Sequence, residues 1–305
     1  MVSPKLSVCL LVYNSLTVGK TIDSILNQSY NDFELIMSDD NSTNDTYQVC
    51  KNYSERDKRI KVIKTPYNIG MAGNTNYAIS NANGKWVALL HHDDILNFDC
   101  LDKWMNVAES LEHIAFVFND YFEKKNAKDE RIRKKFTKII NGRDFLKNTL
   151  LKYWSCPARG TALIRKKYFD VIGGMDSRFG LLADVDLWMR LASRWNVGYI
   201  HEPLIKVGEK KPSDYPKEYK DFSWKRWIIL FDIHAVNIKR VYGEKNLYHW
   251  FKFRVKVSYE IIKWLMYGVI RKKEKIIKDA NEGVNDYEFF FVKIFRSFLL
   301  NIYRI

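Results

Sequence analysis

The chain has 305 residues, of which 47% are hydrophobic and 28% charged, and this composition excludes an intrinsically disordered protein. Lysine and arginine number 50 against 36 aspartate and glutamate, so the formal net charge is +14, which indicates an anionic partner. The charge is uneven: residues 1–120 hold 10 basic and 15 acidic side chains (net −5), and residues 121–305 hold 40 and 21 (net +19).

Short apolar runs alternate with helical patterns over the first 120 residues. We expect strands at 6–12, 33–38, 60–64, 86–90 and 114–118. Between the first two, one face of a helix is indicated by Val18, Ile22, Ile25 and Leu26. Ser42 with Asp45 three positions later is a variant of the capping box and predicts a helix from there to about Ser54. Repeated units of this kind predict an α/β fold with a mostly parallel sheet.

The chain changes character in its second half. We expect a strand at 160–165, a turn at Gly173-Gly174 and a helix from about Asp184 to Trp195. A segment containing proline and lysine, 208–216, marks a boundary. The length suits about two domains, so we divide the chain into residues 1–216, with parts 1–120 and 121–216, and a C-terminal region of residues 217–305.

The C-terminal region is predicted to be helical throughout and is rich in aromatic residues, with 19 in the 84 residues from 222 to 305. From 248 to 270, charged and apolar residues recur on different sides of a helix, and 289–303 has only a narrow polar stripe. Two hypotheses account for such lopsided helices. They pack on the rest of the protein or on a second copy in a homo-oligomer, or they lie on an anionic membrane surface.

Targeting signals and cysteine spacing bear on the location of the protein. No apolar run reaches the length of a membrane-spanning helix, and no cleavage-site pattern follows the first apolar run. The four cysteines have no metal or redox spacing, which indicates free thiols. We therefore expect a cytoplasmic protein, with peripheral binding to the inner face of the cytoplasmic membrane if the C-terminal helices contact lipid.

Acidic pairs follow two of the predicted strands. Asp39-Asp40 follows FELIMS, and Asp93-Asp94 follows KWVALLHH. Ligands of open α/β sheets bind beyond the carboxyl ends of the strands, so these carboxylates are expected to converge on one crevice. Adjacent buried carboxylates repel each other unless a cation or donors offset them, and Mg²⁺ or Mn²⁺ takes oxygen ligands of this kind. A single Asp-Asp pair is also compatible with a helix cap or a solvated turn.

Four blocks in order carry a resemblance to a known family: SVCLLVYN, SILNQSYNDFELIMSDDNSTNDT, NIGMAGNTNYAISNANGKWVALLHHDD and GGMDSRFGLLADVDLWMRL. Over about residues 5–205 the chain resembles glycosyltransferase family 2, the inverting nucleotide-sugar enzymes of the GT-A fold. The resemblance implies a Rossmann-like, mostly parallel sheet flanked by helices, with an all-helical C-terminal extension. It implies that residues 1–120 bind the nucleotide sugar and that residues 121–216 face the acceptor.

The resemblance also implies site residues. The nucleotide-sugar-binding positions are Tyr13, Asn14, Asp40 and Asp93. Within this set, Asp40 resembles the carboxylate that contacts the base and Asp93 the one on the ribose side. Asp94 resembles the ligand of the Mn²⁺ or Mg²⁺ ion that bridges the diphosphate, and Asp184 resembles the base that deprotonates the acceptor hydroxyl. Each role suits a carboxylate chemically, because each requires a hydrogen-bond, metal or proton acceptor.

The chain departs from the family pattern at several positions. His91 stands where many members have the first carboxylate of the Asp-x-Asp-Asp motif, and Ala183 replaces the usual glutamate before the base. His91 or His92 is a metal ligand or, as is commoner at strand ends, a packing residue. Asp186 is the alternative base. A later basic motif is missing, although Lys206 and Lys210 could supply positive charge to a diphosphate.

Two other classes of function are excluded by spacing. A phosphate-binding loop ending at Gly19-Lys20-Thr21 requires a glycine five positions earlier, where Asn14 stands. No nucleic-acid-binding motif accompanies the basic second half. We therefore expect inverting transfer of a sugar, UDP-linked, to a hydroxyl of a glycan or lipid-linked glycan in surface polysaccharide biosynthesis. The alternative is a GT-A-like carbohydrate- or membrane-binding module that has lost catalysis.

Overall fold

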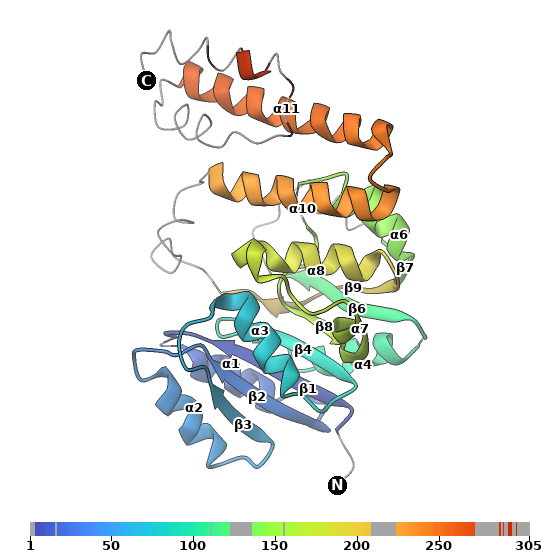
Figure 1. Cartoon of the computed structure of the whole chain (residues 1–305). Helices are drawn as coiled ribbons and strands as arrows, with labels where there is room; N and C mark the ends of the chain where they lie inside the picture. Colours follow the sequence, from blue (N-terminus) through green and yellow to red (C-terminus); the bar gives the residue numbers. More distant parts are fainter. Residues whose placement is uncertain are drawn as a thin grey trace. The chain divides into compact units, whose positions relative to one another are not determined.

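The computed structural model describes residues 4–15, 17–110, 112–122, 136–154, 156–208 and 224–271, together with 287, 289, 292–294 and 297. The chain divides into two compact units, residues 1–209 and 210–305, which are described separately. Figure 1 labels the elements of both.

A parallel half-sheet forms the first part of unit 1. Its strands are β1 (Leu6–Val12), β2 (Phe33–Asp39), β3 (Ile60–Lys64) and β4 (Trp86–His91), paired in the order β3-β2-β1-β4. Every residue of β1 is buried, and β2 and β4 are nearly so, because helices cover both faces of the sheet. The continuous apolar runs therefore predicted these strands correctly, and the mostly parallel sheet is confirmed.

The second half of the sheet is mixed. Beyond β4 the order continues β8 (Ala162–Arg165), β6 (Ile114–Tyr121), β9 (Asn196–Lys206) and β5 (Ile95–Leu96), and β7 (Ile139–Ile140) pairs with β9. Strand β8 runs antiparallel to both of its neighbours, so β6 has the same direction as β4. Strand β9 was not predicted. It has register shifts against β6 and three consecutive exposed residues, His201, Glu202 and Pro203, which break the pattern of a buried strand.

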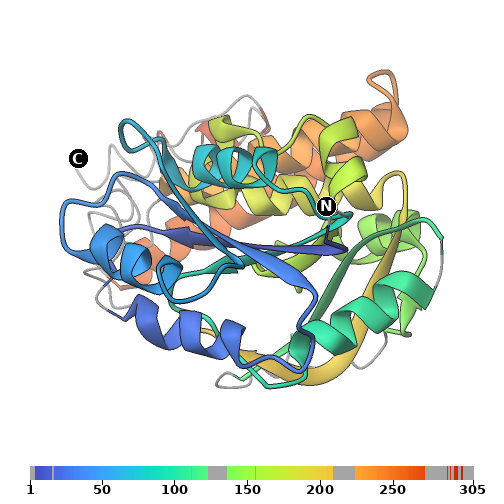
Figure 2. The ribbon, with the colours of Figure 1, turned by 90° about the horizontal axis from the view of Figure 1, so that it is seen from below.

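Helices cover both faces of this sheet, as Figure 2 shows for α1 (Val18–Leu26) and α4 (Cys100–Ser110) on one face and α3 (Gly70–Ser80) on the other. The other helices in the described part of unit 1 are α2 (Thr46–Ser54), α6 (Gly142–Phe145), which continues as a π-helical turn (Leu146–Leu150), α7 (Lys166–Val171), a 3-10 turn (Ser177–Leu182) and α8 (Ala183–Ala192). Trp86, Trp104 and Trp188 are fully buried in the layers that result. All four cysteines are free, as predicted.

The predicted capping box at Ser42 is wrong. Helix α2 begins at Thr46 with Asp45 as its N-cap, and the Thr46 N–H donates to Asn44 Oδ1 at 3.1 Å. Ser42 instead accepts a hydrogen bond from the Asn14 backbone N–H on its Oγ, at 2.9 Å. The serine is therefore used to join two loops, and a side chain nearer the helix takes the capping role.

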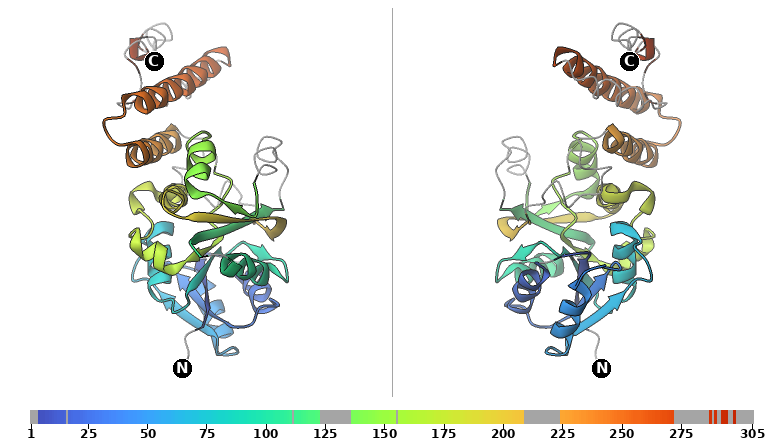
Figure 3. Two further views of the ribbon diagram at one scale, coloured as in Figure 1. Left: turned by 90° about the vertical axis from the view of Figure 1, so that its right-hand side faces the viewer. Right: turned by 90° about the vertical axis from the view of Figure 1, so that its left-hand side faces the viewer.

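Unit 2 contains the helices α10 (Trp224–Tyr242) and α11 (Leu247–Ile270), which follow one another through a short connection in Figures 1 and 3. They pack together through aromatic contacts such as Trp227 with Trp264, whose ring centroids are 6.3 Å apart. Among the residues described, neither of these helices nor any other has the length and apolar character needed to cross a bilayer. The predicted helix over 289–303 lies mostly outside the described residues.

Candidate active site at the carboxyl edge of the sheet

Strand register brings the predicted site residues to one edge of the sheet. Val12, the last residue of β1, pairs with Asp39, and Leu11 pairs with His91. The loops after β1, β2 and β4 therefore leave the sheet side by side. This is the edge at which open α/β sheets bind their ligands.

The loop after β1 is tied to the loop after β2 through Asn14. Its backbone has φ +46°, a left-handed conformation that asparagine tolerates. Its side-chain Oδ1 accepts from the Thr43 N–H at 2.9 Å, and its own N–H donates to Ser42. The preceding residue, Tyr13, keeps an exposed ring. Asn14 therefore holds two loops in register, while Tyr13 presents a flat aromatic surface at the same edge.

Asp40 is buried and accepts three hydrogen bonds from the residues that lead into α3. Its Oδ1 accepts from the Ile69 N–H at 2.8 Å and from the Thr65 hydroxyl at 3.1 Å, and its Oδ2 accepts from the Gly70 N–H at 2.9 Å. A carboxylate is stabilised at this position because the first N–H groups of a helix lack partners within the helix. Asp40 thus fixes the α3 N-terminus against the loop that follows β2.

Asp94 is buried at the end of the loop after β4. Its Oδ2 accepts from the Thr161 hydroxyl and from the His91 N–H, the latter at 3.1 Å, and lies 3.6 Å from His91 Nδ1. Burial raises the pKa of this carboxyl, but the hydrogen bonds and charge of His91 and the hydrogen bond of Thr161 outweigh burial, so the pKa lies below its ordinary value. Asp94 is therefore held as a carboxylate.

The neighbouring Asp93 has an unused oxygen. Its Oδ1 is buried and has no hydrogen-bond partner among the described residues. Gly208 lies so close that an added Cβ would stand 2.4 Å from Asp93 Cβ, and Lys206 pairs with Ile95 in the β5–β9 ladder. The end of β9, which includes Lys206, therefore packs against the Asp93 loop, and the charge of Lys206 toward a diphosphate stays a prediction. Lys210 lies outside the described residues.

Gly160 lies close both to the end of β4 and to the start of α8. A Cβ placed on Gly160 would stand 2.6 Å from His91 Cε1 and 3.6 Å from Asp184 Oδ2. The His91 ring and the Asp184 carboxylate therefore both lie close to Gly160. His91 Nδ1 lies 3.2 Å from Thr161 Oγ1, so the imidazole is oriented by the residue that also donates to Asp94.

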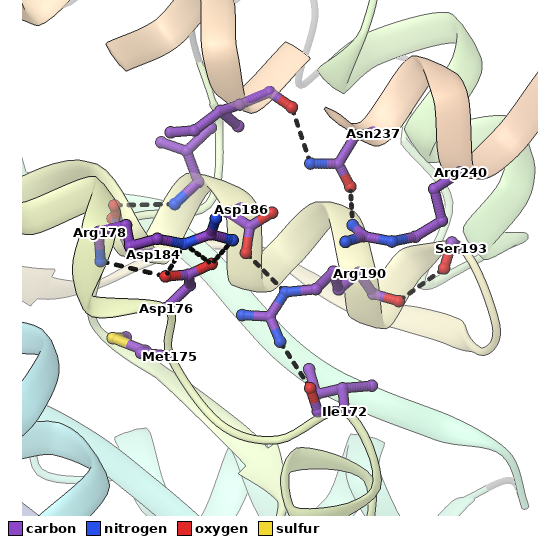
Figure 4. Close-up of polar contacts among 12 residues, drawn as sticks. Ile172, Met175, Asp176, Arg178, Asp184, Asp186, Arg190, Ser193, Asn237 and Arg240 are labelled. Atoms are coloured by element: carbon purple, nitrogen blue, oxygen red, sulfur yellow. Dashed lines mark hydrogen bonds and ion pairs between the residues drawn. The ribbon is translucent and has the colours of Figure 1, made fainter. Parts of the chain in front are cut away.

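Two acids in the first turn of α8 have different surroundings. Asp186 is buried and accepts from Arg190 Nε at 2.6 Å, and Arg190 also donates to the Ile172 carbonyl at 2.9 Å (Figure 4). Asp184 Oδ1 accepts from the Val185 N–H at 2.9 Å, and its Oδ2 is the atom that faces Gly160. The predicted helix from Asp184 is thus observed as Ala183–Ala192, and its two acids have separate settings.

The segment before α8 is anchored to α3. The Met175 N–H donates to Asn76 Oδ1 at 2.8 Å, and Asn76 Nδ2 donates back to the Met175 carbonyl at 2.9 Å. The preceding turn contains Gly173 and Gly174 with φ of +79° and +72°, which confirms the predicted turn and explains the two glycines. The loop that delivers Asp184 is therefore fixed to the helix whose N-terminus holds Asp40.

A divalent cation would find oxygen ligands at the Asp93-Asp94 loop. No three histidine, cysteine, aspartate or glutamate side chains in the described part of the chain form a metal cluster on their own. However, Mg²⁺ and Mn²⁺ are often bound by one or two carboxylates together with substrate phosphates. The ionised Asp94 fits that donor set as its carboxylate ligand.

Sequence reasoning missed three residues that shape this site: Gly160, Thr161 and Gly208. They stand far along the chain from the residues that they contact, and none belongs to a motif. The signal for Gly160 was its place as the first residue of the strand predicted at 160–165, since a glycine within a strand often marks a close backbone approach.

Comparisons with known proteins agree with this geometry. The family model described as Glycosyl transferase family 2 matches residues 7–173. The putative glycosyltransferase EpsE of Bacillus subtilis is 30% identical over 216 residues, 68% of this chain and 73% of that protein. The GalNAc(5)-diNAcBac-PP-undecaprenol beta-1,3-glucosyltransferase of Campylobacter jejuni is 40% identical over 119 residues, 38% of each chain.

A solved structure is similar over nearly the whole chain. The crystal structure of S. aureus TarS 1–349 in complex with UDP-GlcNAc superposes with a TM-score of 0.66 at 16% identity, covering 92% of this chain and 82% of that one. At this identity the likeness concerns the fold.

Proposed function

The chain belongs to glycosyltransferase family 2 and has the GT-A fold, and from this premise we propose that it transfers a sugar from a UDP-linked donor, with inversion, to a hydroxyl of a glycan or lipid-linked glycan. The observation that carries the proposal is the meeting at Gly160 of the loop that ends in Asp93-Asp94 with the carboxylate of Asp184. A leaving-group site and a proton acceptor then flank one reaction centre. The product would enter surface polysaccharide biosynthesis.

The donor is assigned to the loops after β1, β2 and β4. Tyr13 offers a ring on which a base can stack, and Asn14 keeps that loop against the next one. Asp40 accepts from the base imide, and the free Asp93 Oδ1 accepts from a ribose hydroxyl. The TarS complex, which contains UDP-GlcNAc, supports a UDP-linked sugar.

The diphosphate is assigned to Asp94 and a bound Mn²⁺ or Mg²⁺. When bound, the ion would neutralise the negative charge that the leaving UDP acquires. Asp94 is suited to hold it because its pKa is lowered, so it is ionised at neutral pH. Thr161 and the His91 N–H orient its carboxylate, and Lys206 adds a positive charge near the same loop.

Asp184 is assigned as the general base. An acceptor hydroxyl placed near Gly160 would lose its proton to Asp184 Oδ2 while its oxygen attacks the anomeric carbon. The bond between that carbon and the β-phosphate oxygen breaks from the opposite face, and UDP leaves with the bonding pair. Asp186 is unsuited to this role because its carboxylate is paired with Arg190. The Campylobacter enzyme, whose printed name includes a diphospho-undecaprenol, supports a lipid-linked acceptor.

Donor binding and transfer together test this proposal. A panel of UDP- and GDP-sugars, measured by thermal shift with and without Mn²⁺, should show stabilisation by a UDP-sugar that requires the metal. Asp40→Asn should weaken all uracil donors similarly, whatever the sugar, while a GDP-sugar is unaffected. Asp93→Asn should weaken donor binding with the metal dependence kept, and Asp94→Asn should remove that dependence.

The alternative function, a binding module without catalysis, is favoured by one observation, the presence of His91 in place of the first carboxylate. An assay of UDP release from the same donors separates the two functions. A binding module would bind a UDP-sugar without releasing UDP, whereas the enzyme releases UDP when metal and acceptor are supplied.

A further inference from the structure

Helix α11 has an apolar stripe of exposed side chains, one of which, Phe251, contacts Phe289 with ring centroids 5.4 Å apart. The exposed residues of the stripe are Tyr248, Phe251, Val255, Tyr259, Met266 and Ile270. Their spacings of 3, 4, 4, 7 and 4 place all six within an arc of about 100° on a helix with 100° per residue. The stripe therefore runs along nearly the whole helix as one continuous surface.

The opposite side of α11 already has its packing partners. Phe253, Val257, Ile261 and Leu265 are almost completely buried. The helix is thus apolar on two sides, of which one is buried and the other is exposed in the described part of the chain. Contiguous exposed apolar surface of this size on a soluble protein generally marks a site of interaction.

Lysines border the stripe. Lys252 and Lys263 are exposed and lie on the same edge of it, and Lys252 Nζ lies 4.4 Å from the centre of the Tyr248 ring. Between Leu247 and Ile270 there are four basic side chains and one acidic side chain, Glu260, which is itself paired with Lys263 at 3.0 Å. The helix therefore carries a net positive charge, and two of its lysines lie at one edge of the stripe.

We propose that this stripe is a docking face for an anionic phospholipid bilayer, with α11 lying in the plane of the membrane surface. The stripe combines tyrosine, phenylalanine and aliphatic side chains with lysines at its edge. This chemistry is complementary to that of an anionic bilayer surface. Aromatic rings with a polar tip lie at the headgroup level, aliphatic groups enter the acyl boundary, and lysines attract anionic headgroups. A protein groove would not need the lysine border. The inference depends on unit 2 alone and does not rest on the proposed sugar transfer.

Vesicle co-sedimentation of the full-length protein tests the proposal. Vesicles of phosphatidylcholine are compared with vesicles that also contain phosphatidylglycerol. The protein should bind the vesicles that contain phosphatidylglycerol, and the bound fraction should fall with added salt. A triple variant, Tyr259→Ser/Met266→Ser/Ile270→Ser, lacks three side chains that enter the acyl boundary of the bilayer. It should bind the anionic vesicles at least about tenfold more weakly. Lys252→Gln/Lys263→Gln should cost about fivefold per lysine on anionic vesicles.

Matched variants in unit 1 serve as controls. One control variant, Phe98→Ser/Val171→Ser, removes apolar side chains that are exposed like those of the stripe. The other, Lys51→Gln/Lys58→Gln, removes exposed lysines. Both should leave vesicle binding unchanged. Circular dichroism establishes that each variant is folded. The proposal is overturned if the wild-type protein does not bind anionic vesicles, or if the stripe variant binds them as strongly as the wild type does. It is also overturned if the stripe substitutions only convert a dimer to a monomer, which would make a second copy the occupant.

Discussion

Asp186 and Arg190, one turn apart on α8, form an ion pair of 2.6 Å in which only 2% and 10% of the two side chains are exposed. Arg190 is further held by the Ile172 carbonyl. Asp184, two residues before Asp186, instead points its Oδ2 to the space beside Gly160 and His91. The two acids therefore differ in role. Asp186 stabilises the helix through its ion pair, and Asp184 is placed for chemistry.

Removing the Asp186 carboxylate should destabilise the protein. Asp186→Ala leaves a buried guanidinium without its partner, and we expect a loss of about 3 kcal/mol in the free energy of unfolding. Urea denaturation measures it. Asp176→Ala, which breaks the more exposed pair with Arg178, should cost only about 1 kcal/mol. Unchanged stability together with lost transfer would instead identify Asp186 as the base.

A methyl group at Gly160 should impair catalysis with little effect on folding. In Gly160→Ala the new Cβ would stand 2.6 Å from His91 Cε1, so the ring must move. Displacement of groups at the reaction centre should reduce the transfer rate about 10- to 100-fold. In Gly19→Ala the new Cβ meets Tyr53 Oη at 3.3 Å, away from the site, and activity should be retained. A fully active Gly160→Ala variant would remove Gly160 from the site.

The Thr161 hydroxyl should set the acid stability of the site. The Asp94 pKa lies below the unfolded value of about 3.9, so its ionisation stabilises the fold fully above that value, and the contribution is lost as the pH falls through the lowered folded pKa. Thr161→Val removes one hydrogen bond that lowers this pKa. The folded pKa should rise, and acid unfolding should begin at a higher pH.

Urea denaturation from about pH 3 to 7 measures this shift, with Thr75→Val as the control. Thr75 is also buried, but its hydroxyl donates to the Met71 carbonyl in its own helix rather than to a carboxylate. Its loss should lower stability equally at every pH. Parallel pH profiles for wild type and Thr161→Val would contradict the assigned role of Thr161.

Most strands of the sheet were predictable because a strand that is buried on both faces appears in the sequence as an uninterrupted run of apolar residues. The run from Leu6 to Val12 is entirely apolar apart from Ser7, and it is entirely buried. Strand β9 escaped prediction because Pro203 and its exposed neighbours interrupt the pattern, although the strand as a whole joins β6 to β5. Pairing with three other strands outweighs local propensity there.

The candidate site was predictable in part for a similar reason. Asp40, Asp93 and Asp94 follow predicted strands, and parallel strands bring their carboxyl ends to one edge. The contacts of Gly160 and Thr161 with His91 were not predictable, because about 70 residues separate them and no periodic pattern records such a contact. Ser42 was misjudged because its contact with Asn14, 28 residues away, replaced the expected local cap.

The most direct test of the account is the rate of sugar transfer by Asp184→Asn, measured in a single turnover with donor and acceptor saturating. Asparagine keeps the shape of the side chain and loses the proton acceptor, so the rate should fall roughly 10²- to 10⁴-fold while donor affinity stays unchanged. If Asp184 only caps its helix, asparagine replaces it well and the rate stays near that of the wild type. That result would contradict the assignment of Asp184 as the base.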